Sequence, residues 1–195
     1  MSGLPVLTQW GWSSLIHDAF QANQRVIFPP ALDWPEGRDS RMNETMAGLL
    51  VIHVRRGDFT VHCNFLASWN SDWNAFNSLP ELPDQYDQVN SDPRLSPENH
   101  KAYVDHCYPS IEQVVEKVET VRRESHEPLD HIYIMTNGDN SFVAELRTAL
   151  GGLGGWEHIG SNRDLSLTWE QRFVAQAVDM LVAQRAQVFI GNGVS

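Results

Sequence analysis

Residues 48–59 read GLLVIHVRRGDF, an apolar run that ends in two adjacent arginines. The apolar part predicts a buried β-strand, because strands covered on both faces read as continuous hydrophobic runs. In such a strand the side chains of His53 and Arg55 share one face, and a turn at Gly57 would let Arg56 swing round beside them. Two neighbouring guanidinium groups repel each other, whereas a diphosphate would give both a charge-assisted pairing. The stretch therefore predicts a site for a doubly charged anion.

Two other interpretations of this stretch stay open. Arg56 could form an ion pair with Asp58, or with a carboxylate of a neighbouring helix, and bind no ligand. Residues 56–58 also spell Arg-Gly-Asp, which could act as an adhesion tripeptide. That role is disfavoured here, because the tripeptide begins at the end of a predicted buried strand.

The C-terminal part of the chain alternates between helices and strands. Further buried strands are predicted at 131–136, within 155–161 and at 187–191, and amphipathic helices at 110–125, at 140–152 and from 168 onward. This order predicts the fold class α/β, a Rossmann-like parallel sheet with helices on both faces and right-handed crossovers. Ligands of such sheets bind at the carboxyl ends of the strands, which is where the two arginines lie.

Helix boundaries are marked by local signals. Ser110 with Gln113 and Thr168 with Gln171 each form a capping box at a helix start. A glycine pair at 151–152 is expected to end the middle helix. The last helix is expected to carry Phe173, Ala177, Met180 and Leu181 on its apolar side.

Two regions lie outside this alternation. Residues 1–47 contain a predicted helix (WSSLIHDAFQANQ) followed by a linker broken by prolines. Residues 60–108 form a long insertion rich in tryptophan and proline. Loops of this length in compact domains are usually functional or disordered, and the aromatic content of this one favours order.

Composition excludes several classes of protein. The formal net charge of −11 disfavours attraction to nucleic acid or to an anionic bilayer. No apolar run approaches the roughly 20 residues that span a membrane, and no signal peptide is seen. The chain has no Gly-x-Gly-x-x-Gly loop, no Walker-type lysine and no Asp-x-Asp pair to hold a metal against a diphosphate. Any diphosphate would therefore have to be held by the arginines.

The two cysteines, Cys63 and Cys107, each follow a histidine directly. They could form a disulfide, remain two buried thiols, or join the histidines in a zinc site. Zinc is the least favoured of the three, because adjacent side chains in extended backbone point to opposite faces.

HVRRGDF, residues 53–59, resembles the His-x-Arg-Arg motif of GDP-fucose-dependent fucosyltransferases, the group of protein O-fucosyltransferases and α1,6-fucosyltransferases. VDMLVAQRAQVFIGNGVS, residues 178–195, resembles the later motif of that group, in which an aspartate opens a helix-strand unit that ends in a serine-rich loop. The tryptophan-rich insertion and the His-Cys pairs resemble a fungal branch. These enzymes are inverting transferases of GT-B architecture, which has two Rossmann-like halves.

The resemblance implies a role for each matching residue. His53 and Asp179 would contact the guanosine of GDP-fucose, Arg55 would grip the β-phosphate as the catalytic residue, Arg56 would support it, and Ser195 would bond a phosphate oxygen. No metal would be required, and the acceptor would be a protein or glycan hydroxyl.

Asp179 and Ser195 each have a plainer interpretation. Asp179 could pair with Arg172 or Arg185, and Ser195 could be no more than a chain end.

The resemblance also implies how the chain divides. Residues 1–47 would be a remnant of the preceding half, and 48–195 the GDP-binding half, truncated at its C-terminus. Such a chain would bind GDP weakly and transfer nothing alone, and family members work in the secretory pathway. The alternatives are a non-catalytic nucleotide- or glycan-binding module and an α/β domain that binds another phosphate ester.

Overall fold

The computed structural model describes residues 11–29, 45–57, 59–69 and 97–191. The strands are β1 (Met46–Val54), β2 (His131–Thr136), β3 (His158–Ser161) and β4 (Ala186–Gly191). The α-helices are α1 (Ser14–Ala22), α2 (Gln24–Ile27), α3 (Phe59–Trp69), α4 (Pro97–Cys107), α5 (Ile111–Glu124), α6 (Asn140–Gly152), α7 (Trp169–Arg172) and α8 (Ala175–Arg185), and Asn162–Asp164 form a 3-10 turn, η4.

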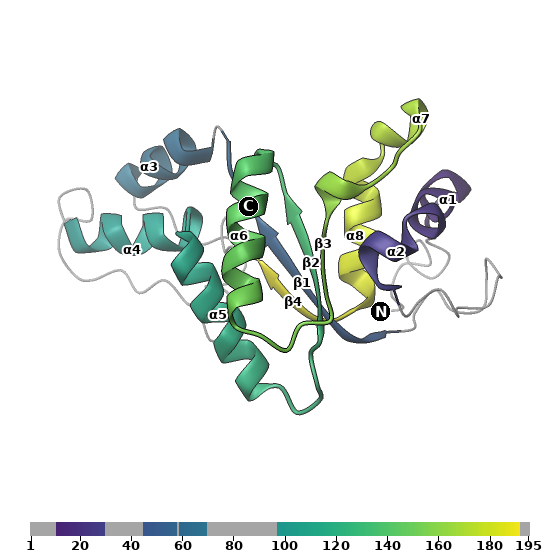
Figure 1. Cartoon of the computed structure of the whole chain (residues 1–195). Helices are drawn as coiled ribbons and strands as arrows, with labels where there is room; N and C mark the ends of the chain where they lie inside the picture. The colour runs from purple at the N-terminus through teal and green to yellow at the C-terminus, as the bar shows by residue number, and fades with distance from the viewer. Residues whose placement is uncertain (1–10, 30–44, 58, 70–96, 192–195) are drawn as a thin grey trace, which may run out of the picture.

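The four strands form one parallel sheet in the order β3-β2-β1-β4 (Figure 1). The predicted fold class is therefore confirmed. β1 lies centrally, with β2 paired from Leu49↔His131 to Val54↔Thr136 on one side and β4 on the other. Eight of the nine residues of β1 are buried or half-buried, as its apolar run predicts.

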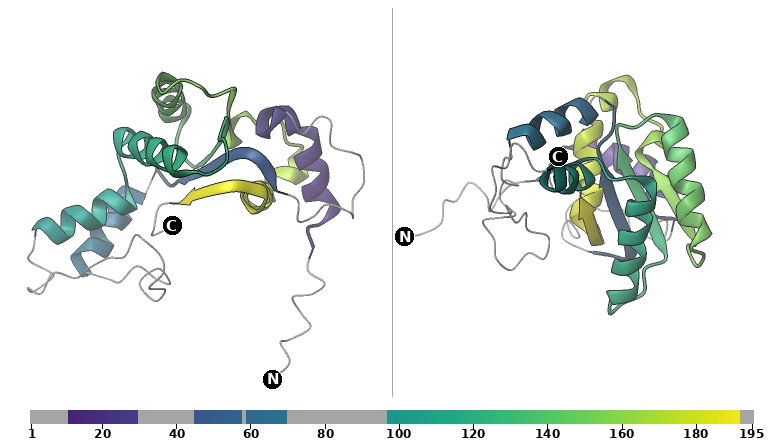
Figure 2. Two further views of the ribbon diagram at one scale, coloured as in Figure 1. Left: turned by 90° about the horizontal axis from the view of Figure 1, so that it is seen from below. Right: turned by 90° about the vertical axis from the view of Figure 1, so that its left-hand side faces the viewer.

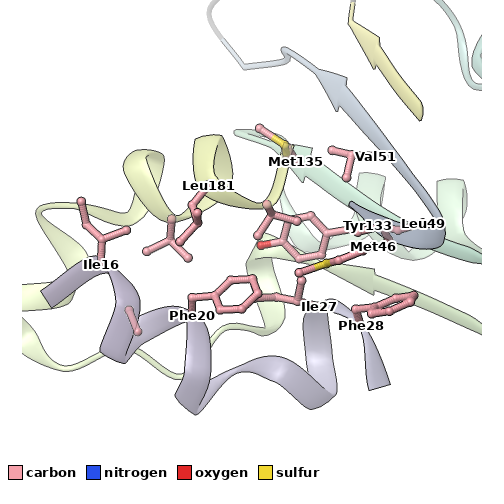
Figure 3. Close-up of a cluster of buried hydrophobic side chains, with 13 residues drawn as sticks. Ile16, Phe20, Ile27, Phe28, Met46, Leu49, Val51, Tyr133, Met135 and Leu181 are labelled. Carbon is pink, nitrogen blue, oxygen red and sulfur yellow. The ribbon is translucent and has the colours of Figure 1, made fainter. Parts of the chain in front are cut away.

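Each face of the sheet is covered by its own helices. α5 and α6 pack on one face, with a core that includes Leu50, Ile52 and Val54. α1, α2 and α8 pack on the other face, over Leu49 and Val51 (Figure 3). Residues 14–27 thus bury side chains in this sheet's core, although they precede the boundary predicted at residue 48.

The predicted helix starts are present, and two predicted helix details differ. Both capping boxes form as expected. α6 ends at Gly152, as the glycine pair predicts, but its C-cap Leu153 is right-handed, and the left-handed backbone occurs later, at Gly154 and Gly155.

The last predicted helix is two helices. The chain bends at Val174, between α7 and α8. Phe173 and Met180, predicted on the apolar side, are instead 73% and 58% exposed, because the bend changes the face that α8 turns to the sheet. Leu181 is buried as predicted, and α8 also buries Val178 and Val182.

Residues 59–69 and 97–107 of the long insertion form helices α3 and α4, which lie side by side beyond the sheet (Figures 1 and 2). A disulfide joins Cys63 of α3 to Cys107 of α4. Both cysteines are therefore unavailable as zinc ligands or free thiols. The pair has a small core of its own, made by the disulfide with Phe59, Ala67 and Tyr103.

Within the described residues, no helix is both long and apolar enough to cross a bilayer.

Candidate functional site

The sheet order creates a topological switch point between β1 and β4. From β1 the chain crosses to β2 and then β3 on one side, and it later returns through α8 to β4 on the other side. Ligands of open α/β sheets bind outside the carboxyl ends of the strands at such a point. His53, near the end of β1, pairs in register with Gly191, the last residue of β4.

His53 belongs to the α8 face of the sheet, and the alternation of the strand assigns Arg55 to the same face. Leu49 and Val51 pack on that face, and side chains two residues apart along a strand share a face. Burial lowers the pKa of His53, and the nearby charge of Arg55 lowers it further. The imidazole is therefore neutral at pH 7, when one ring nitrogen donates and the other accepts.

The guanidinium of Arg55 has no polar partner among the described residues. It lies 4.9 Å from the centre of the Phe59 ring, and its Nε is buried without a hydrogen bond. A buried donor without a partner costs free energy, which an anionic ligand would offset. Asp58, which the sequence offered as an ion-pair partner of Arg56, lies outside the described residues.

Arg56 points to the opposite face, towards α5 and α6, instead of swinging round beside Arg55. Its guanidinium lies 4.3 Å from the ring centre of Tyr108 and 4.4 Å from that of Phe142, and it donates a hydrogen bond to the carbonyl of Pro109. The residue is 6% exposed. These contacts indicate a structural role for Arg56. Among the described residues it has no carboxylate partner.

Asp179 is a buried carboxylate on α8. Oδ1 accepts a hydrogen bond from the Tyr133 hydroxyl (2.9 Å), and Oδ2 accepts one from the Asn162 side chain (2.8 Å). These partners take the place of the ion pair with Arg172 or Arg185 considered from sequence. Burial raises the pKa of Asp179 to about 6, although both hydrogen bonds and the charge of Arg163 act in the other direction.

A cleft of about 730 Å³ opens on the α5 and α6 side of the strand ends. Its polar lining includes Arg56, Ser110, Asn137, Asp139 and Arg163. Arg163 donates from Nε to the carbonyl of Gly138 (2.9 Å), which fixes its side chain over the end of β2.

Comparison with known families shows which family the chain belongs to. A model of the family described as GDP-fucose protein O-fucosyltransferase matches residues 38–195. The chain belongs to this family. A search of curated proteins found no match.

Among solved structures, the chain is similar to POFUT1, crystallised in complex with GDP-fucose. The TM-score is 0.51 at 16% sequence identity, and the match covers 95% of this chain and 40% of that chain. This likeness supports the α/β fold of one half of a larger architecture. The chain thus spans less than half the length of that solved chain.

Three of the residues singled out from the sequence lie around the switch point, and their contacts with a nucleotide stay predictions. His53 and Arg55 share the α8 face of the sheet, and Asp179 belongs to α8 itself. Ser195 lies outside the described residues, so its contact with a phosphate stays a prediction.

Four polar residues near the candidate site were not singled out from the sequence: Tyr133, Asn137, Asn162 and Arg163. Asn137 carried a signal, because it directly follows a buried strand and so lies at the carboxyl edge of the sheet. Tyr133 carried none, since it reads as an ordinary apolar strand residue.

One His and carboxylate cluster in the described part of the chain has the spacing to hold a metal ion. It consists of Asp130, His131 and Glu157, and the Nδ1 of His131 lies 2.5 Å from Asp130. Asp130 and Glu157 precede β2 and β3 respectively, so the cluster lies at the amino ends of the strands. It is therefore at the opposite end of the sheet from Arg55.

Proposed function

We propose that this chain is the donor-binding part of a fucosyltransferase that uses GDP-fucose and transfers fucose to a hydroxyl of a protein or glycan. The observation that carries the proposal is Arg55, a cation at the topological switch point whose guanidinium has no polar partner among the described residues. Membership of the O-fucosyltransferase family supports GDP-fucose as the ligand that would pair with it.

In this proposal Arg55 binds the β-phosphate and stabilises the departing GDP. The acceptor oxygen attacks the anomeric carbon from the side opposite GDP and releases its hydroxyl proton to the solvent. The bond from that carbon to the phosphate oxygen breaks, and the anomeric centre inverts. Negative charge grows on the β-phosphate as the bond breaks. A fixed guanidinium therefore stabilises the transition state more than the ground state. Because Arg55 supplies this positive charge, the transfer needs no metal.

His53 and Asp179 would contact the guanosine. A neutral imidazole can donate and accept at once, and each carboxylate oxygen of Asp179 has a lone pair beyond the one used by its present partner. Guanine presents N–H donors that suit such acceptors. Ser195 would donate to a phosphate oxygen, and Arg56 would hold the end of β1 in place.

The secretory pathway is the compartment proposed for the protein. The disulfide between Cys63 and Cys107 is the kind of bond that persists in oxidising compartments. The family resemblance points to the same compartment.

Titration calorimetry tests the proposal directly. GDP, GDP-fucose, ADP and UDP are titrated into the chain with and without EDTA. We expect binding that prefers the guanine nucleotides and is unchanged by EDTA. Equal binding of all four nucleotides, or of none, contradicts the proposal. Glycan-array binding without any nucleotide affinity would instead support a non-catalytic binding module.

A further inference from the structure

Asn137 connects the ends of β1 and β2 through its side chain. Its Oδ1 accepts a hydrogen bond from the backbone N–H of Arg56 (2.5 Å), and its Nδ2 donates one to the backbone carbonyl of Arg56 (3.0 Å). The pairing of β1 with β2 ends one step earlier, at Val54↔Thr136. The amide of Asn137 therefore continues the ladder beyond the last strand residues.

Residue 56 is consequently held at both its backbone and its side chain. The Arg56 guanidinium lies between the Tyr108 and Phe142 rings and bonds the carbonyl of Pro109. The next residue, Gly57, has a φ of +69°, and a Cβ there would lie 3.3 Å from the Nδ2 of Asn137. The turn after β1 is thus shaped around this asparagine.

These contacts fix the peptide that joins Arg55 to Arg56. Among the described residues Arg55 has no polar contact, and its guanidinium lies beside the Phe59 ring without a hydrogen bond to orient it. Its direction depends on the backbone that follows it. A guanidinium that is already oriented loses less conformational entropy when it binds a phosphate.

We propose that Asn137 is a positioning residue, which holds the backbone at Arg56 so that Arg55 faces the β-phosphate of the donor. This inference rests on the proposed function. An asparagine suits the task because its amide accepts and donates at the same time, while aspartate at neutral pH can only accept. Asn137 is exposed, so its replacement leaves the core intact.

The test compares the affinities for GDP and GMP, because only GDP carries the β-phosphate. For Arg55→Ala we expect GDP to bind no better than GMP. For Asn137→Ala we expect about tenfold weaker GDP binding and unchanged GMP binding, as two hydrogen bonds that orient the phosphate contact are lost. Asn137→Asp keeps the acceptor and should recover part of the loss. Asn140→Ala, an exposed asparagine at the start of α6, is the matched control and should bind both nucleotides like wild type.

A double mutant separates positioning from a general structural effect. If Asn137 acts through Arg55, adding Asn137→Ala to Arg55→Ala should weaken GDP binding no further. Further weakening in the double mutant, equal losses for GDP and GMP, or wild-type GDP binding by Asn137→Ala would each overturn the inference while leaving the proposed function intact. A wild-type chain that binds no GDP would overturn the proposed function itself.

Discussion

At the scale of single residues, the neighbouring arginines Arg55 and Arg56 have different surroundings and therefore different expected roles. The β1 alternation sends Arg55 to the α8 face and Arg56 to the α5 and α6 face. Arg56 is enclosed by two aromatic rings and a carbonyl, whereas the guanidinium of Arg55 lacks any described polar partner. Binding and stability should therefore separate cleanly between the two.

Replacing each arginine by alanine should reveal this separation. Arg55→Ala should abolish the contribution of the β-phosphate to binding and change the free energy of unfolding by less than about 1 kcal/mol. Arg56→Ala should lower that free energy by about 2 kcal/mol, since it removes two cation–π contacts and a charged hydrogen bond. Urea denaturation and calorimetry measure the two quantities. Arg123→Ala, on the exposed side of α5, is the control and should change neither nucleotide binding nor the free energy of unfolding. A large loss of stability for Arg55→Ala would indicate a structural role for Arg55 instead.

Asp179 should make stability depend on pH in mildly acidic solution. Burial raises the pKa of the folded carboxyl to about 6 from an ordinary value of 3.8. Between these values the folded chain binds more protons than the unfolded chain. The free energy of unfolding therefore falls as pH rises from about 4 to 6, by about 3 kcal/mol from this group, and then levels off. Asp179→Asn should remove that trend, which urea denaturation across pH 4–8 would measure.

Nucleotide affinity should follow the opposite trend if Asp179 contacts guanosine as a carboxylate. Binding then requires the ionised form, so the affinity for GDP should rise through pH 6 and be about tenfold weaker at pH 5 than at pH 7. Calorimetry at these two pH values tests this. An affinity that does not change with pH would mean that the carboxylate does not contact the base, and would leave Asp179 as a structural partner of Tyr133.

At the scale of elements, the sequence predicts the sheet well because its signals are local. The six residues of β2 are all buried and are followed by an Asn-Gly-Asp turn, so their apolar run gives both ends of the strand. The helix starts at Ser110 and Thr168 were predictable because each residue forms a capping box with a glutamine three residues later. The direction of Arg56 was not predictable in this way, because it depends on the rings of Tyr108, just before α5, and Phe142, on α6, which are distant in the sequence.

Helices α3 and α4 were not predicted for the same reason. Neither has a strong apolar stripe, and each buries its few apolar residues mainly against the other. The long-range contact that stabilises them is the disulfide between Cys63 and Cys107, which are 44 residues apart. That contact, together with Phe59, Ala67 and Tyr103, forms the centre of the core that the two helices share.

Removing this disulfide should loosen the helix pair and spare the sheet. A cross-link over a loop of this length stabilises by about 4 kcal/mol in the chain-entropy estimate. The α3 and α4 core is separate from the two cores of the sheet. In the double variant Cys63→Ser/Cys107→Ser, amide hydrogen exchange should therefore quicken in 59–69 and 97–107 and stay slow in β1 and β2. Faster exchange in the strands would show that the helix pair supports the sheet.

At the scale of the whole molecule, the helices on the two faces of the sheet come from different parts of the sequence. α5 and α6 follow the strands that they cover, whereas α1 and α2 come from the start of the chain and pack against α8 and β3. Asn23 stabilises this contact with two hydrogen bonds. Its Nδ2 donates to the carbonyl of Ser166 (3.0 Å), and its Oδ1 accepts from the N–H of Ser166 (2.7 Å). The face that holds Asp179 is thus completed by residues outside the predicted boundary at 48.

A chain that begins at residue 45 should accordingly be much less stable than the whole chain. It would expose the surfaces of Leu49, Val178 and Leu181 that Phe20 and Ile27 now cover. Phe20→Ala alone should cost about 3 to 5 kcal/mol, because it opens a cavity in this core, and Phe20→Leu should cost less. Circular dichroism during urea denaturation measures both. If the shortened chain unfolded as cooperatively and at the same urea concentration as the whole chain, α1 and α2 would have to be accessory to the fold, and the boundary at residue 48 would describe an independent folding unit.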